Sequence, residues 1–215
     1  DIGSKSYNLK TIYSNRIITT SKNGPWKELG GNLDMVGASE GNAGVSLSIN
    51  GDGTVIAMGE NEYSSNDGRV RVFSYNGNNW TIKGGATDMV GSTDDIAGTS
   101  VAINIKGNIV AMGEPLYDSS DGKVGRVRVL RYSGSSWNLY GNQTNLIGTP
   151  SSNAGHSVAI NSDGNIIAIG EPTFNNQSGR VRVLRKENDE WNTLGNHTDL
   201  VGMPSSNAGS SLSIS

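Results

Sequence analysis

Acidic and basic side chains recur in this sequence at a near-constant separation, and such pairs can perform acid–base chemistry or form ion pairs. A Gly-Glu segment ends each of three apolar runs, and a Gly-Arg-Val-Arg-Val segment begins 8 or 11 residues after the glutamate. Catalysis needs one site whose neighbours the other copies lack, so a carboxylate that returns in every copy is typical of a structural ion pair. We therefore predict no catalytic residue among them and three cross-strand pairs: Glu60 with Arg69, Glu114 with Arg126, and Glu171 with Arg180.

A second arginine follows two residues after the first in each copy. These residues, Arg71, Arg128 and Arg182, alternate with valines and therefore lie on the strand face opposite to them. We expect their partners to be nearby carboxylates, or the faces of tryptophans on adjacent strands through cation–π contact. The carboxylates in question are Asp34, Asp88 and Asp199.

Four tryptophans occur, one in each copy of the pattern. Tryptophan rings could line a groove that binds sugars, so Trp26, Trp80, Trp137 and Trp191 are candidate ligand-binding residues. The alternative is that each ring anchors an outer strand to its own sheet. The sequence favours this alternative, because each tryptophan recurs together with its surrounding residues.

Few residues could hold a metal ion. The chain has no cysteine, and its two histidines, His156 and His197, occupy non-equivalent positions in different repeats. We therefore expect neither a zinc site nor a histidine-dependent nucleophile. Acids outside the repeat pattern are Asp94-Asp95 in one connection and the pair Asp118 and Asp121 in a lengthened loop. Asp118 and Asp121 are the candidate cation ligands; the alternative is that they are solvated loop acids.

Four segments fit the N-glycosylation sequence Asn-x-Ser/Thr. Two of the acceptors are equivalent, because each lies five residues after the tryptophan of its repeat. Their positions permit an extracellular, glycosylated surface. The acceptors are Asn79, Asn142, Asn176 and Asn196.

Composition limits the class of partner. The 215 residues carry a formal net charge of −3, and 34% of them are hydrophobic. This mild balance gives no electrostatic reason to expect nucleic acid or an anionic membrane surface as partner. No apolar run approaches the roughly 20 residues that a membrane span needs, so we expect no membrane insertion.

The elements that position these residues form a repeat of about 54 residues. The four tryptophans lie 54, 57 and 54 positions apart, and Ala-Gly follows a Met-Val-Gly or similar segment at a constant distance in all four copies. Each complete copy predicts four short strands, which we call a to d, joined by hairpin turns such as Asn50–Gly53. Strand a is predicted at 46–49, 100–103, 157–160 and 211–214, strand b at 55–60, 109–114 and 166–171, and strand c at 68–72, 125–129 and 179–183; the tryptophan opens strand d.

A single four-stranded meander of this composition cannot bury its faces, so neighbouring copies must stack. We predict an all-β fold, a single β-propeller domain over 1–215 built from four-stranded antiparallel blades. The repeats are 26–79, 80–136, 137–190 and the partial 191–215, and 1–25 forms part of a preceding blade, with the tail of a strand b at 1–3 and a degenerate strand c at 16–19. The alternative, a linear β-solenoid, is disfavoured by the hairpin turns. The blades could be an arc of a larger propeller, a near-complete ring of four, or half of a ring formed by two chains.

The segments Ala-Gly-x-Ser-Val-Ala-Ile, Asp-Gly-x-Ile-Ile-Ala-Ile-Gly-Glu-Pro and Gly-Arg-Val-Arg-Val…Trp resemble the FG-GAP-type repeat of integrin alpha subunits over residues 16–215. The resemblance implies a propeller of surface proteins. Many family members carry an Asp-x-Asp-x-Asp-Gly calcium loop between strands a and b. Here that loop reads Asn161-Ser-Asp-Gly164, and Lys106 replaces the aspartate in another copy. Too few oxygen ligands remain for calcium, so we expect no cofactor.

These features together predict a non-enzymatic module for extracellular or surface recognition, adhesion or assembly. Its partners would be a protein or glycan surface ligand, and it could form a homo-oligomer or be completed by further blades. Two alternatives stay open: a glycosidase or lyase that uses Asp94, Asp95, Asp118 or Asp121, and an architectural component of a cell coat, filament or virion.

Overall fold

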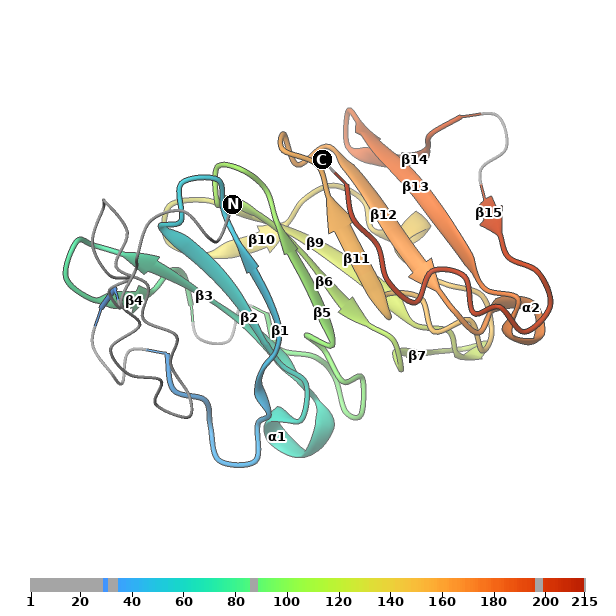
Figure 1. Ribbon diagram of the computed structural model, residues 1–215, viewed down its shortest axis with the longest axis horizontal. Coiled ribbons are helices and arrows are strands. Elements are labelled where there is room, and N and C mark those ends of the chain that lie inside the picture. Colours follow the sequence, from blue (N-terminus) through green and yellow to red (C-terminus); the bar gives the residue numbers. More distant parts are fainter. Residues whose placement is uncertain (1–28, 31–34, 86–88, 196–198, 215) are drawn as a thin grey trace, which may run out of the picture.

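The computed structural model describes residues 29–30, 35–85, 89–195 and 199–214. They form two four-stranded and one five-stranded antiparallel sheet, which we call sheets I, II and III and which follow one another along the chain (Figure 1). Sheet I contains β1 (Ala43–Ile49), β2 (Val55–Glu60), β3 (Arg69–Tyr75) and β4 (Trp80–Ile82). Sheet II contains β5 (Ser100–Ile103), β6 (Ile109–Glu114), β9 (Arg126–Tyr132) and β10 (Trp137–Leu139). Sheet III contains β11 (Ser157–Ile160), β12 (Ile166–Glu171), β13 (Arg180–Glu187) and β14 (Glu190–Thr193), and β15 (Asp199–Val201) also pairs with β13.

The remaining elements are short and lie in the loops. The hairpin β7 (Asp118–Ser119) and β8 (Gly122–Lys123) occupies the lengthened loop of sheet II, and η1 (Thr144–Leu146) is a single 3-10 turn. The turns α1 (Tyr63–Asn66) and α2 (Phe174–Gln177) occupy the equivalent loops of sheets I and III, and both contain residues with positive φ. No helix among the described residues is long and apolar enough to cross a membrane.

An asparagine fixes each hairpin turn between the first two strands of a sheet. In sheet I, the Asn50 carbonyl accepts from the Gly53 amide at 3.2 Å, and its side chain accepts from the Val55 amide at 2.8 Å. Gly53 has a φ of 76°, which glycine adopts without strain. At the tip, the Thr54 hydroxyl and amide donate to the Asp52 carboxylate and lower the pKa of that group. The turns Asn104–Gly107 and Asn161–Gly164 repeat the asparagine bonds.

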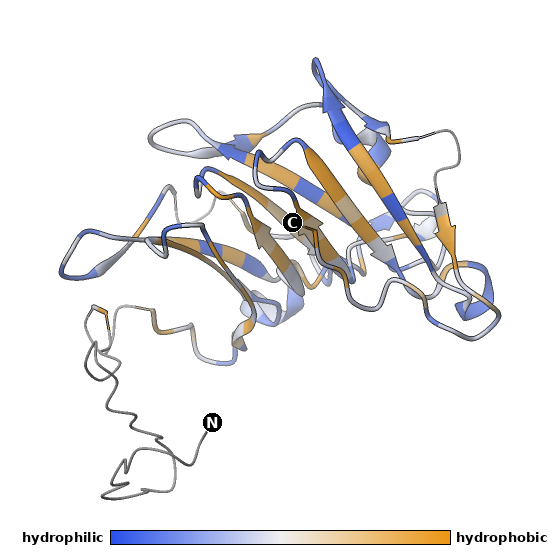
Figure 2. Ribbon diagram, turned by 45° about the horizontal axis from the view of Figure 1, so that its top comes forward, coloured by the Kyte–Doolittle hydropathy of each residue, from blue (hydrophilic) through white to orange (hydrophobic). Residues whose placement is uncertain are grey.

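The sheets pack face to face, with their first strands adjacent. β5 contacts both β1 and β11, and the other strands of each sheet extend outward from these three. Alternating apolar and polar residues along the strands give each sheet apolar faces (Figure 2). One buried cluster fills the junction between sheets I and II, and another fills the junction between sheets II and III. The protein core is therefore divided between the two junctions and a third, smaller cluster of sheet I that contains Met58, Phe73 and Trp80.

Glycine at the penultimate position of the second strand lets neighbouring sheets approach closely. A Cβ added at Gly113 would lie 1.9 Å from the Gly155 carbonyl oxygen and 2.4 Å from Ser100 Oγ. The equivalent glycines of β2 and β12 are equally confined by the next segment of the chain. The carbonyl that confines each of these glycines also accepts a hydrogen bond, 2.7 Å long, from a serine hydroxyl of the first strand. The three donors are Ser46, Ser100 and Ser157. Close backbone contact and a hydroxyl bond thus define every junction.

Two differences from the predicted strands have physical causes. The outer strand of each sheet is split into two pieces. The strand that the tryptophan opens pairs with the second half of strand c. A later segment of the chain pairs with the first half of strand c, in sheet I through Val90 opposite Arg69. The strand predicted at 211–214 does not form, because no described strand lies beside it to supply hydrogen bonds. The strands predicted at 1–3 and 16–19 lie outside the described residues.

Candidate functional site

The repeated glutamates and arginines meet at the end of each sheet where strand b leads into strand c. The glutamate closes strand b, the first arginine opens strand c, and the antiparallel register places them directly opposite each other. The opposed pairs are Glu60 and Arg69, Glu114 and Arg126, and Glu171 and Arg180. The structure thus brings together all three pairs named from the sequence.

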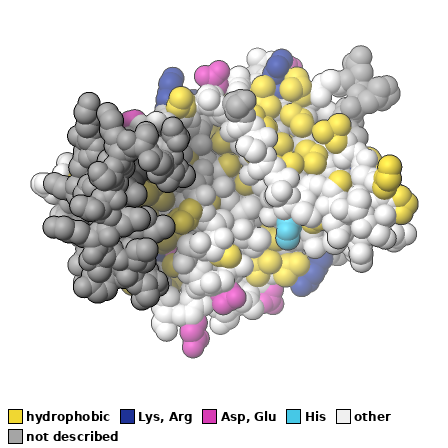
Figure 3. Space-filling view, viewed as in Figure 1, with side chains coloured by type: hydrophobic (Ala, Val, Ile, Leu, Met, Phe, Trp, Pro, Cys, Tyr) yellow, Lys and Arg dark blue, Asp and Glu magenta, His cyan; other side chains and the backbone are white. Residues whose placement is uncertain are grey.

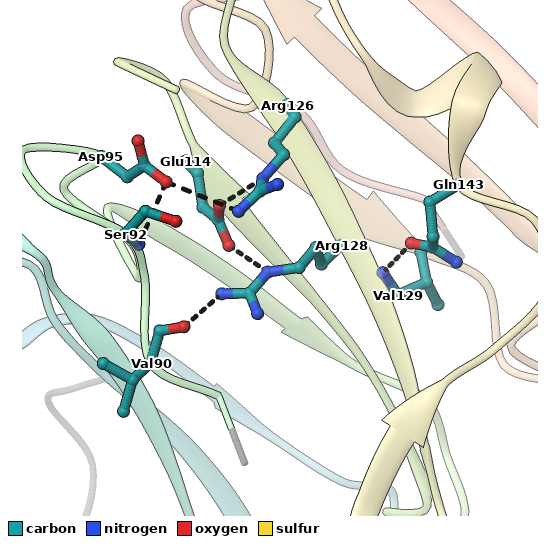
Figure 4. Close-up of polar contacts among 8 residues, drawn as sticks. All are labelled: Val90, Ser92, Asp95, Glu114, Arg126, Arg128, Val129 and Gln143. Atoms are coloured by element: carbon teal, nitrogen blue, oxygen red, sulfur yellow. Dashed lines mark hydrogen bonds and ion pairs between the residues drawn. The ribbon is translucent and has the colours of Figure 1, made fainter. Parts of the chain in front are cut away.

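The cluster of sheet II shows the geometry (Figure 4). The Glu114 side chain is 0% exposed, and its Oε2 accepts from Arg126 Nε at 2.5 Å. Its Oε1 accepts from Nε of Arg128, whose Nη2 donates to the Val90 carbonyl of sheet I at 2.9 Å. The carboxylate therefore binds two guanidinium groups, and one of these also binds the neighbouring sheet.

Sheets I and III repeat this arrangement. Arg69 Nη2 lies 2.8 Å from Glu60 Oε2, and Arg180 Nη2 lies 2.7 Å from Glu171 Oε2. The second arginines again bind the other carboxylate oxygen and a backbone carbonyl outside their own sheet: Arg71 that of Val36, Arg182 that of Ile147. Both carboxylate oxygens accept from a guanidinium in all three described clusters, which is the arrangement of a structural ion pair.

The second arginines have partners among the described residues that the sequence did not suggest. Arg71, Arg128 and Arg182 bind the same glutamates as the first arginines, because residues two apart on a strand lie on one face. Among the described contacts, Arg71 lies over the ring of Phe73 rather than over a tryptophan. Asp34 and Asp88, named as partners from the sequence, lie outside the described residues, and the side chain of Asp199 is not described.

An aromatic ring covers the first arginine of each cluster. Tyr63, Tyr117 and Phe174 each lie three residues after the glutamate, and their ring centroids are 3.8, 3.8 and 3.9 Å from the guanidinium carbons of Arg69, Arg126 and Arg180. A cation over a ring face is stabilised by the ring quadrupole. These aromatic residues were not expected as partners of the arginines, although their constant distance of three residues from each glutamate is a signal in the sequence.

Asp95 makes the second cluster different from the others. It is buried, and its Oδ2 lies 3.5 Å from Arg126 Nη2 and accepts from the Ser92 amide at 3.1 Å (Figure 4). The equivalent positions in the other repeats are Gly41, Ser152 and Ser206. Asp95 therefore adds a second carboxylate to this cluster, while its neighbour Asp94 is exposed.

The described tryptophans are buried, Trp137 and Trp191 in the two sheet junctions and Trp80 in a separate cluster of sheet I. The indole Nε1 of each donates to a backbone carbonyl of the preceding repeat: Trp80 to Leu29 at 2.9 Å, Trp137 to Lys83 at 2.6 Å, and Trp191 to Tyr140 at 2.9 Å. Buried rings offer no face to a sugar, so these three residues serve packing. Each ring therefore contacts the preceding repeat in addition to its own sheet, in which Trp80 lies beside Tyr75 and Trp137 beside Tyr132. Trp26 lies outside the described residues.

Loss of one such indole bond should be measurable. We expect Trp137→Phe to destabilise the protein by about 2 kcal/mol, because it leaves the Lys83 carbonyl unpaired and removes buried volume. Chemical denaturation monitored by circular dichroism gives this value. Asn138→Ala, at the exposed neighbouring position of β10, is the control and should change stability by less than about 0.5 kcal/mol. Equal effects for the two variants would contradict the role of the indole.

The candidate cation ligands lie in the exposed β7–β8 hairpin. Asp118 lies opposite Lys123 in the strand register of the hairpin, and the Asp121 amide donates to Ser119 Oγ at 3.1 Å. No group of three or more His, Cys, Asp or Glu side chains within the described ranges is arranged to hold a metal ion. His156 lies at a bend before β11, and His197 is outside the described residues.

The glycosylation sequences occupy different settings. Asn79 and Asn176 are exposed, in the turn before β4 and in α2 respectively. Asn142 is exposed too, but its amide donates to Glu190 at 3.1 Å and accepts from the Thr144 hydroxyl at 2.7 Å. Glycosylation there would disrupt this contact with sheet III. Asn196 lies outside the described residues.

Comparison with known proteins leaves the family open. No family model matches the sequence, and no curated protein matches it. One similar solved structure is that of a protein assigned as TolB from Agrobacterium tumefaciens, with 10% sequence identity and a TM-score of 0.42. The match covers 70% of this chain and 45% of that chain, so this chain spans less than half of the length of that protein.

Proposed function

We propose that this chain is a non-enzymatic β-propeller module of the FG-GAP-like type, for recognition, adhesion or assembly at an extracellular or cell surface. The observation that carries the proposal is the equivalence of the three Glu–Arg clusters, which engage both oxygens of each buried glutamate in all three sheets. The repeated acids and bases therefore stabilise a scaffold. Chemistry specific to a ligand must come from residues that differ between repeats.

Such differences concentrate in the loops between strands b and c. Sheets I and III have the turns α1 and α2 there, whereas sheet II has the β7–β8 hairpin and three more residues. At the other end of the sheets, the a–b turns share one geometry and bind one another, since the Gly51 amide donates to Ile105 and the Ile105 amide to Ser162. We assign the b–c end as the surface that binds a protein or glycan ligand.

Exposed asparagines in glycosylation sequences support a surface location. Asn176 lies in α2 at the b–c end, and Asn79 lies in the turn that leads into β4. Both side chains are exposed, as an acceptor must be. Mass spectrometry of the protein from its natural source would detect the added sugar.

A glycan array and a cell-surface protein screen test the proposal. We expect binding that is reduced at least about tenfold by the triple variant Asp118→Ala, Asp121→Ala, Lys123→Ala at the b–c end. The control replaces three exposed charged residues of the a–b turns, Asp52→Ala, Lys106→Ala and Asp163→Ala, and should bind normally. A parallel hydrolase and lyase screen uses the same polysaccharides. Turnover of any of them would overturn the non-enzymatic assignment, and equal loss in both triple variants would overturn the assigned surface.

A further inference from the structure

Two Asn-Gly pairs lie among the described residues, in two different hairpin turns of sheet I. Asn50-Gly51 begins the turn between β1 and β2, and Asn76-Gly77 lies in the turn between β3 and β4. In such a pair the backbone nitrogen of the glycine can attack the side-chain amide carbon of the asparagine, because glycine has no side chain that hinders the approach. Asparagine is among the thermolabile residues of proteins. The two pairs share this chemistry but differ in their surroundings.

The structure protects Asn50-Gly51 from this attack. The Gly51 amide donates to the Ile105 carbonyl of the next a–b turn at 3.0 Å, so its proton is engaged. Asn50 is 7% exposed, and its side-chain oxygen accepts from the Val55 amide at 2.8 Å. A Cβ added at Gly51 would lie 2.3 Å from Ile105 Cγ1, so the next turn covers this backbone closely. Attack at Asn50 therefore requires local opening of the turn.

Asn76-Gly77 lies in an open setting. Both residues are exposed, and the turn that contains them projects beyond sheet I (Figure 1). Among the contacts between described residues, the Gly77 amide donates no hydrogen bond. A Cβ added at Gly77 would meet nothing within 4 Å. Water and base can therefore reach this nitrogen and remove its proton, which makes it a nucleophile.

Hydrogen bonds within the turn also prepare the side chain of Asn76 for attack. Its Oδ1 accepts from the Asn78 amide at 3.0 Å and from the Asn79 amide at 2.9 Å. Two donors on one carbonyl oxygen stabilise the negative charge that develops on that oxygen during attack, as the donors of an oxyanion hole do. The Tyr75 hydroxyl donates to the Gly77 carbonyl at 2.8 Å and keeps the attacking residue in the turn. The turn thus supplies an accessible nucleophile and a polarised electrophile.

We propose that Asn76 is a site of spontaneous deamidation and that Asn50 is not. The Gly77 nitrogen loses its proton to base and forms a bond with Asn76 Cγ. The bond from Cγ to Nδ2 breaks, the nitrogen takes up a proton and leaves as ammonia, and a cyclic succinimide remains. Water then opens the ring at either of its carbonyls, which gives aspartate or isoaspartate at this position. The reaction consumes water alone, and it is independent of any ligand of the b–c end.

Either product changes the turn. Each conversion adds one negative charge to the formal net charge of −3, on a molecule whose face in Figure 3 is largely neither charged nor hydrophobic. Isoaspartate also adds a carbon atom to the backbone, which alters the 3.1 Å bond from the Asn76 amide to the Asn79 carbonyl. That bond leads the chain into Trp80, whose ring lies 5.3 Å from the ring of Tyr75 between centroids. We therefore expect altered tryptophan fluorescence in the isoaspartate form.

Peptide mapping by mass spectrometry, after incubation of the full chain in mildly alkaline buffer, tests the proposal. We expect Asn76 to convert at a rate that rises with pH and is at least about tenfold higher than the rate at Asn50, because local opening limits attack there. Ion-exchange chromatography should separate the converted protein by its added charge. In concentrated urea both turns are unfolded, and the two rates should become similar.

Two variants make the result specific to this position. Asn76→Gln keeps an amide but would have to close a larger ring, which is slower, so it should show no conversion at position 76 over the same period. Asn76→Asp has the charge of one product and should elute with that product. Conversion of Asn76 that is no faster than that of Asn50 in the folded protein would contradict the proposal. Equal conversion of Asn76→Gln and the wild type at this position would contradict the attack by Gly77.

Discussion

Glu114→Gln is expected to destabilise the protein by about 3 kcal/mol, the lower part of the range for breaking a buried ion pair. Glutamine keeps the shape of the side chain but leaves Arg126 and Arg128 without their carboxylate. The lower part of the range applies because these arginines retain some contact with solvent, at 21% and 16% side-chain exposure. Equilibrium unfolding in urea measures the change in the free energy of unfolding.

Two further variants make the result specific to the cluster. Asp118→Asn removes an exposed carboxylate from the same loop and should change stability by less than about 0.5 kcal/mol. Asp95→Asn should cost more in the Glu114→Gln background than in the wild type, because Asp95 is then the carboxylate closest to Arg126. Additive effects would show that Asp95 does not belong to the cluster, and a neutral Glu114→Gln would show that the cluster does not stabilise the fold.

Gly113→Ala is expected to separate sheets II and III and to destabilise the protein by at least about 3 kcal/mol. The new Cβ would lie 1.9 Å from the Gly155 carbonyl oxygen, and because that oxygen belongs to the backbone, no side-chain rotation relieves this contact. The same urea titration measures the loss, and exposure of Trp191, buried in this junction, should shift its fluorescence to longer wavelength.

Gly134→Ala provides the comparison. Gly134 has a φ of 101°, but a Cβ there would meet nothing within 4 Å. Its substitution therefore costs the conformational penalty alone, about 1 kcal/mol. If Gly113→Ala proved no worse than Gly134→Ala, the close approach of backbones at the junctions would be tolerant, and the repeated glycine would need another explanation.

The elements of each repeat could be predicted from the sequence because local patterns determine them. Alternation of apolar and polar residues located β1, short apolar runs located β2 and β6, and the Asn-x-x-Gly turns fixed the register of the hairpins. Once the b–c pairing was known, Glu114 and Arg126 had to face each other. The pairs therefore required no knowledge of how sheets pack.

Contacts between sheets could not be predicted in this way. The carbonyl of Val90 lies within reach of Arg128 only because the outer strand of sheet I is split and its second piece lies against sheet II. Trp137 likewise finds its acceptor, Lys83, 54 positions earlier in the chain. Repeat spacing indicated that such residues matter to the scaffold, but which atoms meet depends on the distance and rotation between sheets, which no single repeat encodes.

Each junction is stabilised by the same few bonds, and this has a mechanical consequence. A serine hydroxyl, an indole, a guanidinium and the backbone bonds between a–b turns tie sheet II to its neighbours. Under tension applied to its two ends, such a chain yields junction by junction, with similar forces for each step, because stability is a sum of nearly equal local terms. The molecule would then lengthen in even increments and absorb a pull without losing every sheet at once.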